Sequence, residues 1–140
     1  MQTFLPYDDY WECARVLDYK RLGKQRVEAY QILNVLTVNK GSRWRNHPAV
    51  RMWRGHEQSL LWYAEIMCAE WTIFRGYRDS IQGRLESEHG NLWAQEFHNP
   101  PWLVNPDLHL SHQSNLVRKA PEFYIPIFGN LESVPYLWPV

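Results

Sequence analysis

The sequence has few cysteines, and none of its cysteine and histidine spacings is typical of a metal site. Cys13 and Cys68 are the only cysteines in 140 residues, and we expect both to be small hydrophobic side chains in a reducing cytoplasm. His109 and His112 are three residues apart and could form a pair of ligands, but no third ligand has a matching spacing. We therefore predict no metal and no other cofactor.

Long apolar runs are also missing. No stretch reaches the roughly 18 consecutive apolar residues that a membrane span requires. The first residues, Met-Gln-Thr-Phe-Leu-Pro, lack the basic start and the apolar stretch of a secretory signal peptide. These two absences predict a cytoplasmic protein with no membrane partner.

The chain has no formal net charge, with fifteen Lys and Arg against fifteen Asp and Glu. Its charges are nevertheless segregated. Residues 15–54 contain ten cations and two acids, for a net charge of +8, while residues 55–140 contain five cations and ten acids, for a net charge of −5. A basic region on an otherwise acidic protein attracts phosphate locally. The distribution therefore favours a nucleic acid as the partner.

Apolar residues are plentiful, at 45% of the sequence with eight tryptophans, which excludes disorder. The length of 140 residues suits one domain with a sizeable core, and no repeat or linker divides it. We predict an all-α fold in which residues 1–140 form a compact single-domain helical bundle around a long central helix. We expect this domain to be a monomer.

Helical periodicity and end signals locate the elements. They predict a short helix that ends near Leu17 and further helices over about 18–38, 56–74, 79–88 and 106–120. Asp18 is the expected N-cap of the central helix, and Gly23 within it would allow a close approach by a neighbour. Residues 121–140, rich in proline and aromatic side chains, are predicted to be an irregular tail.

One carboxylate, Glu28, ends a run of cations in the central helix. Helical spacing places Arg21, Lys24 and Glu28 on one face. An acid held rigidly among cations suits a catalytic acid or base that acts on a polyanionic substrate. The alternative is a solvent-exposed face with a weak Lys24–Glu28 ion pair.

Two other segments have side chains that suit contact with nucleic acid. Arg43, Arg45 and Arg51 can bind phosphate, and Trp44 can stack on a base. Asn46 and His47 can bind base edges or sugar, or one of them can cap the helix that Pro48 begins. In the second segment we predict a phosphate-contacting face that consists of Ser111, His112, Asn115, Arg118 and Lys119.

Short motifs along the chain resemble a known family. Leu17-Asp18, Leu22 and Glu28 are followed by Asn46-His47-Pro48 and then by Glu70 with Arg75-Gly76-Tyr77. This pattern resembles the pyrimidine dimer DNA glycosylase family, which includes the phage endonuclease V. The stretch Ser-His-Gln-Ser-Asn-Leu at 111–116 and the segment 121–124 are similar to the bacterial and phage branch of that family.

The resemblance implies a compact helical enzyme that excises a damaged base and can then nick the strand. In the phage enzyme the N-terminal α-amine attacks the sugar C1′ to form a Schiff base, assisted by a glutamate that matches Glu28. An α-amine with a pKa of about 8 is a usable nucleophile at neutral pH. Here the bulky Gln2 usually prevents removal of the initiator methionine, so the amine would belong to Met1. Lys24 or an activated water remain alternatives.

Two classes of function follow. The first is a DNA glycosylase, with or without lyase activity, that acts on a damaged or modified pyrimidine in a duplex. Trp44, Asn46 and His47 would lie near the extruded nucleotide. The phosphates would be held by Arg21, Lys24, Arg26, Arg43, Arg45, Arg51 and Arg118. The second class is a non-catalytic module that binds nucleic acid or a nucleotide on the same helical scaffold.

Overall fold

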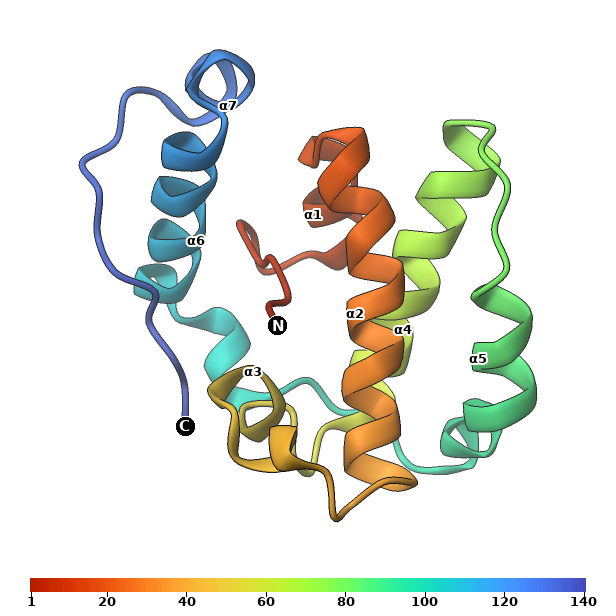
Figure 1. The fold of residues 1–140 in the computed structure, drawn as a ribbon. Coiled ribbons are helices and arrows are strands. Elements are labelled where there is room, and N and C mark those ends of the chain that lie inside the picture. Colours follow the sequence, from red (N-terminus) through yellow and green to blue (C-terminus); the bar gives the residue numbers. More distant parts are fainter.

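The computed structural model describes residues 1–140 and contains helices but no strands, which confirms the all-α prediction. The chain forms seven α-helices, and Figure 1 shows the N-terminal segment lying in the middle of them. Their bounds are α1 Tyr10–Val16, α2 Tyr19–Thr37, α3 Pro48–Arg51, α4 Glu57–Ala69, α5 Gln82–His89, α6 Pro106–Lys119 and α7 Pro121–Phe128. No helix is long and apolar enough to cross a membrane.

Helix α2 is the central element and packs along α4, as Figure 1 shows. Leu22, Ala29 and Leu33 on its inner face are buried, as the helical period predicts. Asp18 occupies the predicted N-cap position of α2. The predicted capping bond is absent, because the Asp18 side chain accepts no hydrogen bond from a backbone N–H of the first turn. It binds Arg21 and the Tyr124 hydroxyl instead, and so joins the start of α2 to α7.

The predicted helix over 56–74 is present as α4 and a wider π turn, Glu70–Phe74, that continues it. The helical period of the apolar residues in this segment predicts Phe74 in the core, but the residue is 64% exposed and meets Trp11 edge-on. The π turn shifts the side-chain register at the end of the helix, so the α-helical period no longer places Phe74 inward. Gly76 then ends the element with φ of +75°, a conformation that glycine adopts easily.

Gly23 permits the close approach that its position in α2 predicts. A Cβ atom at this position would lie 3.1 Å from Cη2 of Trp71, below ordinary contact distance. The indole has little room to move, because Tyr77 packs on it at 4.3 Å between ring centroids and its Nε1 donates to the Arg78 carbonyl at 2.7 Å. Gly23 therefore allows α2 and the end of α4 to touch.

The C-terminal prediction was wrong for residues 121–128, which form α7. Pro121 ends α6 but also begins a new helix, since proline fits the first helical turn where no N–H partner is needed. Within the predicted tail, only residues 129–140 are irregular. They run back along α6 toward α3 in Figure 1. Both cysteines are buried and unpaired, as expected.

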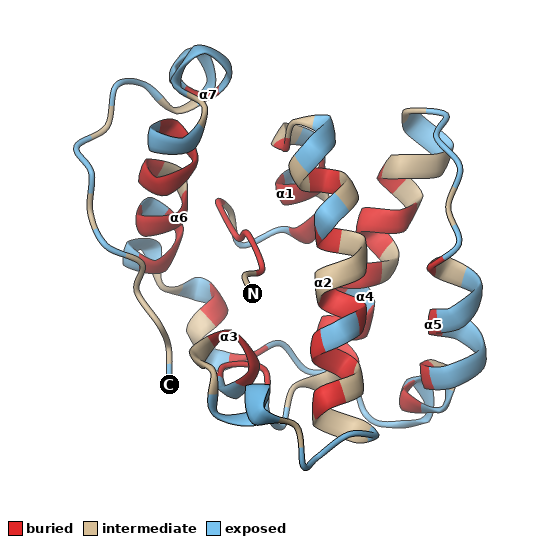
Figure 2. Ribbon diagram, viewed as in Figure 1, coloured by how far each residue is buried: buried red, intermediate tan, exposed pale blue.

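The N-terminal segment, residues 1–7, runs between α6 on one side and α2 with α4 on the other (Figure 1). We call it the N-terminal arm. Figure 2 shows it as a buried strip in the middle of the molecule, and Thr3, Phe4 and Leu5 are all at most 6% exposed. A buried segment without helix or strand needs other partners for its polar backbone groups. Those partners are side chains, and they position the first residue.

Candidate active site

Helix α6 holds the N-terminal arm from one side. Nδ1 of His112 accepts from the Leu5 N–H at 2.8 Å, and Nδ1 of His109 lies 2.7 Å from the Leu5 carbonyl. One residue further along, Nε2 of Gln113 donates to the Pro6 carbonyl at 2.8 Å. These bonds occupy the backbone groups that would otherwise be buried without partners.

Helices α2 and α4 hold the N-terminal arm from the other side. The amide of Gln25 bonds the Phe4 N–H at 2.9 Å and the Gln2 carbonyl at 3.1 Å. The Tyr63 hydroxyl lies 2.9 Å from the Phe4 carbonyl, and just after α3 the indole of Trp53 donates to Thr3 Oγ1 at 3.0 Å. The arm therefore has hydrogen bonds to its surroundings at residues 2–6, and the Met1 side chain at its end packs against the core.

Three cavities that share lining residues open along α2, two of them where the N-terminal arm meets the helix. Their volumes are about 430, 500 and 540 Å³, and Glu28 is the one residue that lines all three. Met1 lines the second and third together with Glu28, and Lys24 lines the first and second. The three residues proposed for catalysis thus meet at one place, which we call the Glu28 pocket.

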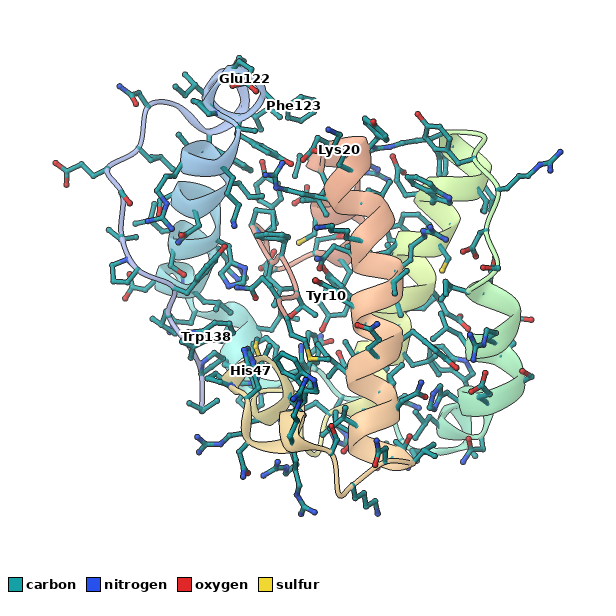
Figure 3. The ribbon with its side chains drawn as sticks, viewed as in Figure 1. Tyr10, Lys20, His47, Glu122, Phe123 and Trp138 are labelled. Carbon is teal, nitrogen blue, oxygen red and sulfur yellow. The ribbon has the colours of Figure 1, made fainter.

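Cations and aromatic rings surround the cavity of the Glu28 pocket that Met1, Lys24 and Glu28 all line. The cations Lys20, Arg21, Lys24 and Lys119 line the cavity of about 500 Å³. On its other side the Trp138 ring meets His47 edge-on at 6.1 Å between centroids, and Figure 3 shows these two side chains facing each other. Such a pocket suits a flat group attached to a polyanion.

The electrostatics place the Met1 amine beside His47. The pKa of His47 is lowered, first by desolvation and then by the positive charge of the chain's α-amine. A neutral ring is consistent with its bonding, because Nδ1 of His47 accepts from the Ala49 N–H at 3.0 Å. Across the pocket, burial raises the pKa of Tyr136, while a hydrogen bond with Gln2 acts in the opposite direction. Both side chains are therefore uncharged at neutral pH.

Comparison with known proteins identifies the family. The family model described as pyrimidine dimer DNA glycosylase matches residues 1–83. The chain belongs to this family. No curated protein and no solved structure matches the chain. The residues that match the family include Met1, Lys24, Glu28, Trp44 and His47, whereas α6, α7 and the C-terminal tail lie outside them.

Several residues that the sequence predicted for binding lie around the pocket of this family member. Arg21, His47 and Lys119 line the cavity of about 500 Å³, and Trp44 lines the cavity of about 540 Å³. His47 also caps α3, so both interpretations of that residue fit its position. No group of three or more His, Cys, Asp or Glu side chains lies close enough together to hold a metal ion.

The remaining predicted DNA contacts of the basic segment lie outside the pocket. Arg43, Arg45, Asn46 and Arg51 are exposed. Arg45 donates to the Lys40 carbonyl at 3.1 Å, which holds the turn before α3 in shape. The three arginines therefore add positive charge to the protein surface outside the cavity that Trp44 lines.

The predicted phosphate-contacting face on α6 is wrong for Ser111, His112 and Asn115, which are at most 2% exposed. Their polar groups bind other parts of the chain: Nδ2 of Asn115 donates to the Val134 carbonyl at 3.0 Å, and Oγ of Ser111 accepts from the Leu137 N–H at 3.1 Å. A polar side chain can serve buried backbone as well as solvent, and periodicity alone does not distinguish the two.

Two predicted phosphate-binding arginines are already engaged within the chain. Arg26 forms an ion pair with Asp79, its side chain is only 12% exposed, and its guanidinium lies 4.5 Å from the centre of the Trp71 ring. It is therefore not free to contact DNA, and that prediction was wrong. Arg118 remains exposed but binds Asn115 and, at 3.2 Å, Ser133.

The motif Glu70 with Arg75-Gly76-Tyr77 is structural. Arg75 bonds Glu70 at 3.2 Å and donates to the carbonyls of Ala14 and Arg15 at 3.1 and 3.2 Å. These are carbonyls at the end of α1 that the helix itself leaves free. Glu70 and Arg75 therefore fix α1 against the end of α4, while Tyr77 packs on Trp71, which lines the cavity of about 430 Å³.

Several residues of the pocket were not predicted from the sequence. Helical spacing places Gln25 beside Glu28, three positions before it, but gives no sign that its amide also binds the N-terminal arm. Lys20 was recognised as part of the cationic run but not as a pocket residue. Gln2, Tyr136 and Trp138 carry no periodic or motif signal, and Tyr136 and Trp138 enter the pocket only because the tail folds back along α6.

Proposed function

We propose that this protein is a DNA glycosylase with associated lyase activity that acts on a damaged or modified pyrimidine in duplex DNA. The observation that carries the proposal is the meeting of the Met1 end of the clamped arm with Glu28, among cations, in cavities wide enough for an extruded nucleotide. Membership of the pyrimidine dimer DNA glycosylase family supports it independently.

The proposed reaction begins with the unprotonated α-amine of Met1. Its lone pair attacks C1′, the C1′–N bond of the damaged nucleotide breaks, and the base leaves with the bonding electrons and takes up a proton. The amine nitrogen then loses one proton, its lone pair forms a C1′=N double bond as the C1′–O4′ bond breaks, and O4′ takes up a proton, which leaves a ring-opened, protonated imine. Removal of a C2′ proton lets the 3′ phosphate leave, which nicks the strand.

Glu28 is the proposed acid–base group of this sequence. As a carboxylate beside C1′ it would stabilise the positive charge that develops on the sugar, and it would then move protons for ring opening and elimination. Arg21, Lys24 and Lys119 would hold the phosphates around the extruded nucleotide, and Arg43, Arg45 and Arg51 the flanking duplex. Trp44 and His47 would contact that nucleotide itself.

We favour the Met1 amine over Lys24 as the nucleophile. The arm that carries Met1 is held by buried hydrogen bonds on both sides. The Lys24 ammonium makes no hydrogen bond or ion pair, and it ends a flexible four-carbon chain on an exposed residue. A nucleophile held in position loses less entropy on the way to the transition state.

The test uses two duplexes, one with a defined pyrimidine dimer and one with an abasic site. Wild-type protein should release base from the first and, in the presence of borohydride, become covalently linked to the second, because borohydride reduces the imine to a stable amine. Base release without trapping would contradict the amine step but leave the glycosylase. Binding to both duplexes with neither release nor trapping would instead establish the non-catalytic module.

A further inference from the structure

Gln25 joins the N-terminal arm to Glu28 through a single buried side chain. It is 1% exposed, and its amide makes four short contacts. Oε1 lies 2.9 Å from the Phe4 N–H nitrogen and 2.7 Å from the Tyr63 hydroxyl, while Nε2 lies 3.1 Å from both the Gln2 carbonyl and Oε2 of Glu28. Every donor and acceptor of the amide is therefore used.

The orientation of this amide follows from its backbone partners. A backbone N–H can only donate, so the atom beside Phe4 must be the oxygen. A carbonyl can only accept, so the atom beside Gln2 must be the nitrogen. The second N–H of the amide then necessarily points at Glu28, whose carboxylate accepts it. A flipped amide would set two acceptors against each other at both Gln2 and Glu28.

We propose that Gln25 is a positioning residue that holds the Met1 end of the arm and the Glu28 carboxylate at a fixed separation. The inference rests on the proposed function. Gln25 occupies Oε2 of Glu28 and leaves Oε1 of that carboxylate without a protein partner, available to substrate. The same amide grips the arm on both sides of Thr3, two residues from the reacting amine.

Tyr63 holds the Gln25 amide and the N-terminal arm together from the side of the core. It is fully buried in α4, and its single hydroxyl hydrogen is shared between Oε1 of Gln25 and the Phe4 carbonyl. Because the donor reaches both the amide and the arm, neither can rotate away without leaving a buried polar group unpaired. Nucleophile and carboxylate are thus coupled through the core rather than through solvent.

Two variants test the role of Gln25. Gln25→Met keeps the length of the side chain and removes all four bonds, and a displacement of about 1 Å costs roughly a hundredfold in rate. We therefore expect trapping on abasic-site DNA to slow about a hundredfold, with kcat reduced and the Kd for DNA unchanged. Gln25→Glu keeps the two bonds that the side chain accepts, from the Phe4 N–H and the Tyr63 hydroxyl, and loses only the two that it donates, so it retains more of the contacts to the arm should the first variant be unstable.

Gln25→Glu should also change the pH dependence of the trapping rate. A second carboxylate beside Glu28 disfavours the ionised form of Glu28. The acidic limb of the profile of trapping rate against pH should therefore move to higher pH by about one unit. Gln95→Glu, which makes the same change at an exposed position outside the pocket, should leave the profile unmoved. A purely structural role would lower the melting temperature without shifting that limb.

The outcomes separate the two proposals. If wild-type protein traps and both Gln25 variants trap at its rate with an unshifted profile, the positioning role is overturned and the glycosylase–lyase stands. If wild-type protein neither traps nor releases base, both proposals fall together. Slow trapping with intact DNA binding in Gln25→Met, and a shifted limb in Gln25→Glu, support the positioning role.

Discussion

At the residue scale, Glu28 differs from the other carboxylates that lie near cations. Asp18, Glu70, Asp79 and Glu88 each form an ion pair with an arginine. Glu28 forms none, although Arg21 and Lys24 line the same cavity, and its one hydrogen-bond partner is the neutral Gln25. The weak Lys24–Glu28 pair of the alternative interpretation is therefore absent, and the carboxylate remains available for chemistry.

Replacement of Glu28 by glutamine tests that chemistry. Glu28→Gln can still accept the bond from Gln25, so fold and DNA affinity should be kept, while loss of the charge and of proton transfer should reduce base release by at least about a hundredfold. Single-turnover base release and a binding titration measure the two quantities. Turnover near the wild-type rate would show that Glu28 is a surface charge with no role in catalysis.

His112 makes the stability of the fold depend on pH. Burial, with a smaller effect of His109, lowers its pKa to about 3 in the folded protein, against about 6.5 in the unfolded chain. Below about pH 6.5 the unfolded chain takes up a proton that the folded protein refuses. Stability from this residue is therefore complete above about pH 6.5 and is lost as the pH falls toward 3.

Two substitutions separate the charge of His112 from its hydrogen bond. Both His112→Asn and His112→Leu should weaken the dependence of the unfolding free energy on pH between about 4 and 6.5. Asparagine places Oδ1 where Nδ1 stood and can still accept from Leu5, whereas leucine leaves that N–H unpaired at a cost of about 1–3 kcal/mol. Urea unfolding at several pH values measures both effects, and an unchanged slope would contradict the assignment.

At the element scale, the turn Arg43–Asn46 carries the cations that lead away from the pocket. Ser42 caps it through the Trp44 N–H, and the arginine side chains stay exposed. The local sequence therefore determines a small turn whose arginine side chains face solvent, one of them, Arg45, also bonded to the Lys40 carbonyl. The proposed role of this turn is to bind the duplex beside the lesion.

Arg43→Ala tests that role, because each lost phosphate contact removes about one counterion from the salt dependence of binding. We expect weaker DNA binding and a slope of log K against log salt that is smaller by about 0.9. Arg84→Ala is the matched control, since Arg84 is an exposed arginine on α5, outside the basic segment, that pairs with Glu88 and lies over the Tyr30 ring. Equal slopes for Arg43→Ala and wild-type protein would place the turn away from DNA.

At the scale of the whole molecule, the two ends of the sequence build one site. The N-terminal arm is held by His109, His112 and Gln113 of α6, which lie beyond the residues that match the family. Tyr136 and Trp138 of the tail complete the pocket wall. The position of Met1 therefore depends on the folding of the entire chain.

A one-residue extension before Met1 tests this arrangement. It moves the α-amine by up to about 3.5 Å while the clamped arm stays in place. Trapping and nicking should be lost, and DNA binding kept, because no phosphate contact changes. Lys24→Ala supplies the contrast: loss of trapping in that variant, with the extended protein still fully trapped, would transfer the role of nucleophile from Met1 to Lys24.

The sequence by itself determined the helices and the central position of α2. Periodicity places Leu22, Ala29 and Leu33 inward, and local signals such as Ser42 and Pro48 begin the turns, because these preferences act over one or two helical turns. The same short range placed Arg21, Lys24 and Glu28 together. Where another geometry interrupts the period, as in the π turn before Arg75 or at Pro121, local reasoning failed.

Only the tertiary structure decided which polar side chains face the substrate and which serve the buried backbone. His112 and Asn115 have the polarity of surface residues, yet they are buried because the arm and the tail need hydrogen-bond partners there. Gln25 became the link between Met1 and Glu28 because the arm passes over α2. These contacts join residues far apart in the sequence, and a pattern that covers a few neighbouring positions contains no information about them.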